Sequence, residues 1–320
     1  MSKFKFTSIF LNAIIILGDK MKKFIIFVCL VIVLGLCYFY RENIMLFYYD
    51  KFVYANKNVD PPKKNSYYRD YDFEFVKNTD TFSPKNYQDL LNIYYTVLNS
   101  GVEEFSFFCP KNYEDCLSEV DSLANDNTTL SNINNFVHPY NSFSDIKTRY
   151  NDLGKVTIEI NKVYSKEKIK EINTKIEQIL NKIKLTNDSQ ENIKSIHDYI
   201  INTSKYDTDR SDNNIANYDS DTAYGNLLQG YGLCGGYADS MELFLEQLHI
   251  KSFKVASDNH IWNAVNLNKK WYHLDLTWDD PVSKNKQDIL EYNFFMITTD
   301  ELKELKTNQH NYDKNVYKEI

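Results

Sequence analysis

One cysteine, Cys234, stands in the segment YGLCGGYADS, between a glycine-containing loop and a predicted helix. The helix is indicated by apolar residues at the spacing of one helical face: Met241, Phe244, Leu245 and Leu248. A helix N-terminus carries unsatisfied N–H groups and a partial positive charge, which favour the nucleophilic thiolate form of a cysteine in the first turn. The two glycines after the cysteine indicate that the backbone approaches something closely at this point. We therefore interpret Cys234 as a candidate nucleophile.

Two downstream segments carry the other groups that a thiol nucleophile needs. HIWNAV begins at His260, WYHLDLTWDD spans residues 271–280, and a polar Asn268-Lys269 turn lies between them. Both segments are rich in β-branched and aromatic residues, which predicts a β-hairpin. If the loop has an even number of residues, His260 and Asp275 project from the same face, as a base and its carboxylate. A loop with an odd number would send Asp275 to the other face.

Two histidines are candidates for the general base. His273 is an alternative to His260, because it lies two residues from Asp275 on the same strand face. Asp275 itself stands between Leu274 and Leu276, and a carboxylate buried in an apolar strand needs a partner. A protonated His260 would supply that partner.

The segments GLCGGYADS, HIWNAV and WYHLDLTWDDP resemble, in order, the cysteine, histidine and aspartate segments of the transglutaminase-like superfamily, particularly of its bacterial, Firmicute-type members. The resemblance covers roughly residues 192–282. It implies an α+β fold with a papain/transglutaminase-like core, in which the nucleophile lies at a helix N-terminus packed on an antiparallel sheet. It also implies Cys234 as nucleophile, His260 as general base and acid, and Asp275 as the residue that orients the imidazole. His273 then becomes a supporting or packing residue.

These residue types predict acyl transfer. His260 takes the thiol proton, the thiolate attacks an amide carbonyl, and water or an amine resolves the acyl-enzyme. Water as acceptor would make a peptidase or amidase, and a lysine-type amine would make a crosslinking transglutaminase. The backbone N–H of Cys234 and one further donor would hold the oxyanion, and Gln229 and Tyr224 are both candidates for that donor.

Three further residues are predicted to line the site: Trp262, Asn263 and Trp278. The two tryptophans flank His260 and Asp275 in the sequence, where they would exclude water, although tryptophans in strands commonly belong to the core.

An uncharged apolar run covers residues 24–40, about the length that a short or tilted transmembrane helix needs. Lys20, Lys22 and Lys23 precede the run, so the positive-inside rule places the N-terminus in the cytoplasm and the remainder outside. We therefore expect a single-pass protein of the cell membrane with an extracellular catalytic domain.

A cleavable signal peptide is the alternative to a retained anchor. No small-x-small cleavage site follows the apolar run. Cys37 would suit lipidation, but Leu36 occupies the position where a small residue is required. We expect a signal anchor at 21–41, with 1–20 as an upstream extension.

The remaining chain is expected to form a stalk at 42–66, an N-terminal α/β region at 67–164 and the catalytic domain at 165–320. Alternating residues at 156–163 predict a strand, and Ser165 is expected to cap a long helix after it.

Cys109 and Cys116 stand close together in the exported region, separated by turn-forming residues, and are predicted to pair as a disulfide. The alternative is that all exported thiols stay reduced. Cys29 and Cys37 fall in the membrane run, which leaves Cys234 as the free thiol.

Composition and spacing limit the partners. The net charge of −7 argues against nucleic acid, which needs a basic face. Cys234, His260, His273 and Asp275 lack the spacing of zinc motifs. The acid-rich loop 207–221 lacks the glycine and glutamate of a calcium loop. We expect no metal and no cofactor.

Two functional hypotheses remain. The first is a cell-surface cysteine acyl-transfer enzyme that acts on proteins or on cell-wall peptides. The second is a non-catalytic transglutaminase-like module that keeps the fold for binding or as a scaffold. The presence of all three triad residue types favours the enzyme.

Overall fold

The computed structural model describes residues 19–48, 59–282 and 289–320. The chain divides into two compact units, 1–58 and 59–320. Most of the expected upstream extension and residues 49–58 of the expected stalk lie outside the described residues.

The first unit contains two helices, α2 (Asp19–Phe39) and α3 (Arg41–Tyr48). Helix α2 is long and apolar enough to cross a membrane, and its side chains are exposed within the unit. It covers nearly all of the predicted apolar run. A signal sequence near an N-terminus would meet the same description.

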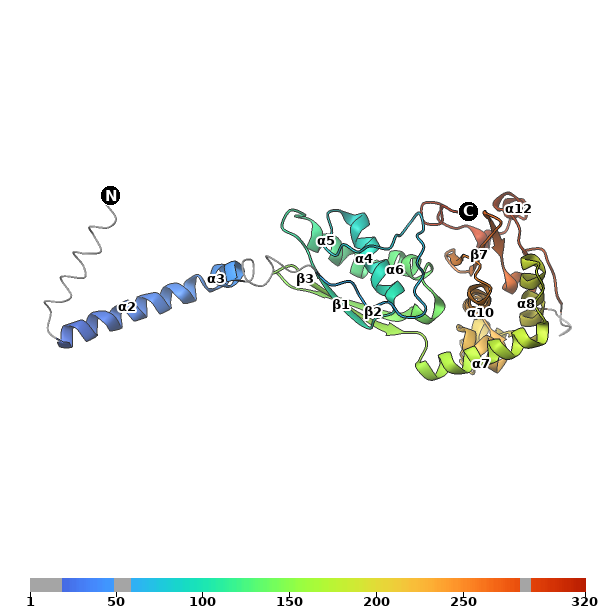
Figure 1. The fold of residues 1–320 in the computed structure, drawn as a ribbon, viewed down its shortest axis with the longest axis horizontal. Helices are drawn as coiled ribbons and strands as arrows, with labels where there is room; N and C mark the ends of the chain where they lie inside the picture. Colours follow the sequence, from blue (N-terminus) through green and yellow to red (C-terminus); the bar gives the residue numbers. More distant parts are fainter. Residues whose placement is uncertain (1–18, 49–58, 283–288) are drawn as a thin grey trace. The chain divides into compact units, whose positions relative to one another are not determined.

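The N-terminal part of the second unit contains a three-stranded antiparallel sheet. It consists of β1 (Glu104–Phe108), β2 (Phe143–Tyr150) and β3 (Lys155–Lys162), in the order β1-β3-β2. The buried side chains of β3 are Val156, Ile158 and Ile160, which alternate along the strand as predicted. Three helices cover this face of the sheet: α4 (Tyr87–Ser100), α5 (Cys116–Asn125) and α6 (Asn127–Asn134) (Figure 1).

The chain between the first sheet and the candidate nucleophile is mainly helical. They are α7 (Lys166–Ile183), α8 (Ser189–Thr203), α9 (Thr208–Asn213), the short helix η3 (Gly225–Gln229) and α10 (Cys234–Gln247). The predicted cap of α7 is confirmed, because the Ser165 side chain accepts a hydrogen bond from the Lys168 N–H. Two short parallel strands, β4 (Lys205–Tyr206) and β5 (Tyr231–Gly232), bring the chain to the start of α10.

A second antiparallel sheet follows α10. Its strands are β6 (Ser252–Ala256), β7 (Ile261–Leu267) and β8 (Lys270–Leu274), in sequence order. In the described residues, three short helices follow this sheet: α11 (Leu276–Asp279), α12 (Thr299–Glu304) and η4 (Asn308–His310). A further short helix, η2 (Pro139–Asn141), lies in the N-terminal part, just before β2. The α+β class predicted from the sequence is confirmed.

Two hydrophobic cores meet at the second sheet. One core fills the space between the first sheet and its helices and includes Phe253 and Trp262 on one face of the second sheet. The other core joins α7, α8 and α10 to Val265 and Leu274 on the opposite face. The second sheet is therefore covered on both faces, and β6 and β7 pack directly against α10.

The N-terminal region and the expected catalytic domain lie within one compact unit, because that first core contains residues from both. The boundary between 67–164 and 165–320 stays a prediction.

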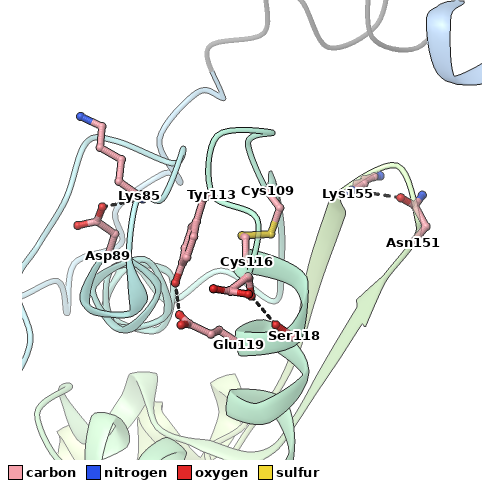
Figure 2. Close-up of a disulfide and its surroundings, with 10 residues drawn as sticks. Lys85, Asp89, Cys109, Tyr113, Cys116, Ser118, Glu119, Asn151 and Lys155 are labelled. Atoms are coloured by element: carbon pink, nitrogen blue, oxygen red, sulfur yellow. Dashed lines mark hydrogen bonds between the residues drawn. A yellow bond between two sulfur atoms is a disulfide. The ribbon is translucent and has the colours of Figure 1, made fainter.

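A disulfide links Cys109, just after β1, to Cys116, the first residue of α5 (Figure 2). Two further contacts hold the loop between them: the Tyr113 hydroxyl donates to the Glu119 carboxylate, and the Cys109 N–H donates to the Gly154 carbonyl at 2.8 Å. The disulfide therefore connects the end of a strand of the first sheet to a helix that covers this sheet. Of the cysteines in the described residues, Cys234 is the free thiol of the second unit.

Candidate active site

The candidate nucleophile occupies the first position of a helix. Helix α10 begins at Cys234 after Leu233 in extended conformation. A side chain at Gly236 would overlap the Ser220 carbonyl oxygen, and a Cβ at Gly235 would lie 2.9 Å from the Asp221 carbonyl oxygen. The close backbone approach predicted for these glycines is therefore made by the loop before η3. This packing leaves the first turn of α10 with N–H groups that have no partner inside the helix.

Cys234 is half-buried and lies on a cavity of about 240 Å³. The cavity wall also includes Tyr206, His260 and Trp278. A thiol in this position is accessible to a small substrate group and shielded from bulk water on its other sides.

The hairpin has the even loop on which the predicted juxtaposition depends. Asn268 and Lys269 both have positive φ, 54° and 66°, and Leu267 pairs with Lys270. Two such residues form the tight turn that suits the twist of a hairpin. Because the loop has two residues, His260 and Asp275 project to the same face.

Strand β8 is shorter than the predicted segment. It ends at Leu274, and Asp275 then caps α11: its Oδ1 accepts hydrogen bonds from the N–H groups of Thr277 at 2.9 Å and Trp278 at 3.2 Å. The Asp275 carboxylate therefore has two roles: one oxygen caps the helix, and the other contacts side chains of the site. The backbone fixes Oδ1 and leaves Oδ2 for side chains.

Oδ2 of Asp275 lies 2.5 Å from Nε2 of His260. Both side chains are almost fully buried. Burial by itself would lower the pKa of His260, but the Asp275 carboxylate, with a smaller effect from the Cys234 side chain, raises it to about 10. Burial would raise the pKa of Asp275, but His260 and His310 lower it to about 2.

The ring orientation of His260 assigns the two nitrogens different partners. Nε2 is used by Asp275, and Cys234 lies close enough to the ring to help raise the pKa of His260, which leaves Nδ1 for the thiol. A protonated His260 beside Cys234 favours a thiolate–imidazolium pair. The arrangement of these three groups can perform nucleophilic acyl transfer.

His273 lies apart from this arrangement. Its Nδ1 accepts a hydrogen bond from the Trp262 indole N–H at 3.0 Å, and its Nε2 lies 3.1 Å from the Thr299 hydroxyl. Burial and the neighbouring His310 lower the pKa of His273 to about 3, so it is neutral at ordinary pH. A neutral histidine with both nitrogens occupied has the packing role expected of it.

The two tryptophans lie against His260, but Asn263 does not. Trp262 stacks on the His260 ring with centroids 5.6 Å apart, and Trp278 meets it edge-on at 6.4 Å. Asn263 follows Trp262 directly and so points to the opposite face of β7, where its amide donates to the Ala238 carbonyl at 3.0 Å. The structure therefore places Asn263 against α10 and outside the cavity.

Both sequence candidates for the second oxyanion donor are bonded elsewhere. Gln229 accepts a hydrogen bond from the Asp219 N–H at 2.8 Å, and the Tyr224 hydroxyl donates to Glu171 at 2.9 Å. Neither residue lines the cavity around Cys234. Tyr206, at the end of β4, does line it.

Sequence reasoning missed two residues of the site. Tyr206 gave only the weak signal of an aromatic residue before the acid-rich loop. His310 gave none, yet its Nε2 lies 2.9 Å from Oδ2 of Asp275.

Buried ion pairs hold α10 in place behind the cavity. Arg69 pairs with Glu242 at 2.5 Å and with Glu246 at 2.6 Å. Lys254 of β6 pairs with Asp239 at 2.6 Å. Buried charges are tolerated only when they are paired and hydrogen-bonded, so these contacts fix the helix to its neighbours.

His260, Asp275 and His310 together offer ligand atoms within 4.8 Å of one another, a set that could hold a metal ion. The same atoms already form direct hydrogen bonds at 2.5 and 2.9 Å. A cation would have to displace both bonds inside a buried cluster, and the contacts therefore fit a hydrogen-bonded network better.

The match with known proteins covers the segment that carries this geometry. Residues 177–276 match the family model described as the transglutaminase-like superfamily. A search of the curated proteins finds no match.

Two solved structures are similar to part of the chain. One, described as a TGase, is 13% identical with a TM-score of 0.33, over 46% of this chain and 47% of that one. The other, a cysteine protease candidate from Cytophaga hutchinsonii, is 13% identical with a TM-score of 0.27, over 46% of this chain and 65% of that one. The chain spans less than two thirds of each. The segment 177–276, which contains Cys234, His260 and Asp275, is the part of the chain that is similar to the transglutaminase-like superfamily.

Proposed function

We propose that the chain is a cysteine acyl-transfer enzyme that acts on peptide or side-chain amides through Cys234, His260 and Asp275. The observation that carries the proposal is the 2.5 Å hydrogen bond between His260 and Asp275 beside a free thiol at the first turn of α10. The transglutaminase-like match of residues 177–276 supports it, because members of that superfamily are usually cysteine-based enzymes.

The proposed reaction has two steps. The Cys234 thiolate attacks the amide carbonyl carbon, the carbon–nitrogen bond breaks, and the His260 Nδ1–H gives its proton to the departing amine. Water or a primary amine then attacks the thioester and loses a proton to Nδ1. The carbon–sulfur bond breaks, and the thiolate–imidazolium pair is restored.

The oxyanion of each tetrahedral intermediate needs two donors. The Cys234 N–H is one, since it belongs to the free first turn of α10. For the second we propose the Tyr206 hydroxyl in place of Gln229 and Tyr224, because Tyr206 shares the cavity with Cys234. Burial raises the pKa of Tyr206, so its hydroxyl keeps the proton that it would donate.

We further propose that α2 anchors the chain in the cell membrane with residues 59–320 outside. The support is the apolar length of α2 and the lysines at its start, Lys20, Lys22 and Lys23. An outward-facing enzyme would meet cell-surface proteins and cell-wall peptides as substrates. The disulfide between Cys109 and Cys116 suits an oxidising exterior.

A non-catalytic binding or scaffold module is the competing function. The half-buried thiol favours the enzyme, because binding alone does not require a thiol next to a histidine that is paired with a carboxylate.

Acyl-donor profiling of the full chain tests the proposal. A pool of peptide amides is incubated with the protein, with and without a primary amine, and products are identified by mass spectrometry. Hydrolysed or amine-coupled products that depend on Cys234 support the enzyme, and their ratio identifies the acceptor. Cys234→Ala is the control, and equal product patterns from the two proteins would favour the binding module.

A further inference from the structure

A second histidine contacts the aspartate of the candidate site. His310 lies in η4, and its Nε2 is 2.9 Å from Oδ2 of Asp275, the same oxygen that His260 approaches at 2.5 Å. Only 6% of the His310 surface is exposed. Oδ1 is already bound by backbone N–H groups, so the two imidazoles share one carboxylate oxygen.

Aromatic rings hold the His310 imidazole in place. Phe294 stacks on it with centroids 4.9 Å apart, and Trp262 and Trp278 meet it at steep angles at 4.8 and 5.1 Å. Both tryptophans also contact the His260 ring. A ring packed in this way has little freedom to leave Asp275.

The hydrogen-bond pattern assigns the proton of His310. Its Nδ1 lies 2.6 Å from the Thr307 hydroxyl. A carboxylate can only accept, so Nε2 carries the hydrogen that points to Asp275, and Nδ1 can accept from Thr307. Both nitrogens therefore have a partner, and His310 acts as a fixed donor to Asp275.

We propose that His310 is a positioning residue of the acyl-transfer site: by donating to Oδ2 it shares the charge of Asp275 and limits how strongly Asp275 stabilises the His260 imidazolium. This role rests on the proposed function, in which that imidazolium must release its Nδ1 proton to the departing amine. A carboxylate with more donors is less basic, so it stabilises the imidazolium less strongly.

The ionisable groups around this pair are few. His260 and His310 contact Asp275, and His273 and Asp279 lie close enough to interact with it electrostatically. Cys234 shares its cavity with His260. His310 also borders a separate cavity, which is lined by the lysines Lys303, Lys306 and Lys314.

The test is a titration of His260 by NMR in the full chain, labelled with ¹⁵N at its 6 histidines. His310→Leu removes the donor at similar volume, and His310→Gln keeps an N–H at a similar position. In His310→Leu the titration midpoint of His260 should rise by about one pH unit, because a hydrogen bond to a charged group is worth roughly one to two units. His310→Gln should restore the midpoint.

A matched control separates positioning from stability. His197 is fully buried, and its Nε2 lies 3.1 Å from Asp279, so His197→Leu removes a similar buried histidine–aspartate bond away from Asp275. It should lower the melting temperature as His310→Leu does, without moving the His260 midpoint. If His310→Leu does not fold, Thr307→Val takes its place, because loss of the Thr307 hydroxyl frees the other tautomer and should move the midpoint upward by a smaller amount.

An unchanged or lowered His260 midpoint in His310→Leu, or in Thr307→Val as its replacement, would overturn the role of His310. The titration needs no substrate, so it is independent of acyl transfer. If the midpoint rises but no amide is processed, the proposed function fails and the coupling between the two histidines stands. If amides are processed and the midpoint does not move, the reverse holds.

Discussion

Replacing Asp275 by asparagine should abolish fast acyl transfer while the fold survives. The side-chain carbonyl of asparagine can keep the two hydrogen bonds from Thr277 and Trp278 that Oδ1 accepts at 2.9 and 3.2 Å. The amide nitrogen then replaces Oδ2 and points its hydrogens at His260 and His310. Both histidines must accept at Nε2, which moves their protons to Nδ1.

The consequence for His260 is a hydrogen at Nδ1 that faces Cys234 on a neutral ring. Such a ring cannot take the thiol proton. We expect the acylation rate to fall by about 10⁴-fold, or roughly 5 kcal/mol of transition-state stabilisation, the size of effect seen when a triad aspartate becomes asparagine.

The cost in stability should be much smaller and should depend on pH. The pKa of Asp275 is lowered from 3.8 to about 2 in the folded state, which corresponds to on the order of 2 kcal/mol of stability. This contribution is complete above pH 3.8 and is lost as the pH falls through 2. The difference between the wild type and Asp275→Asn should therefore be largest near neutral pH and should shrink in acid.

The assay measures single-turnover acylation and thermal unfolding on the same preparation. Asp279→Asn is the matched control, because Asp279 is also buried and paired with a histidine, His197. It should keep the acylation rate. A fully active Asp275→Asn enzyme would refute the reasoning, remove Asp275 from the site and make Asp279 and Asp280 the candidates for its role.

Three further predictions follow from the same geometry. Iodoacetamide should label Cys234 faster in the wild type than in His260→Ala at the same pH, because protonated His260 stabilises the attacking thiolate; equal labelling of the two proteins would contradict the ion pair. Reduction of the Cys109–Cys116 disulfide, whose cysteines are 7 positions apart, should lower the free energy of unfolding by roughly 2 kcal/mol in denaturant titrations, and an unchanged midpoint would count against it. Protease added to intact cells should digest residues 59–320, and their protection would place the catalytic part inside.

Local patterns explain what the sequence could predict. The apolar spacing after Cys234 marks α10, and the two-residue turn Asn268-Lys269 sets the register that brings His260 next to Asp275. Period-two alternation along β7 also places Asn263 on the face opposite Trp262, so the sequence pattern itself excludes Asn263 from the site.

Contacts between distant segments explain what it could not. His310 reaches Asp275 across 35 positions, and Arg69 reaches Glu242 across 173. Neither pair shares a motif or a spacing, because tertiary packing alone brings them together. Tyr206 joins the cavity for the same reason, through the pairing of β4 with β5.

The most direct test of the central claim is to trap the acyl-enzyme. The full chain is mixed with a reactive peptide ester or amide, quenched in acid and mapped by mass spectrometry. We expect one acyl adduct, on Cys234, and its formation should be much slower in His260→Ala. The adduct should decay by hydrolysis in water alone, or decay faster when an amine is added. An adduct on another residue, or none on Cys234 in a folded protein whose thiol still reacts with iodoacetamide, would contradict it.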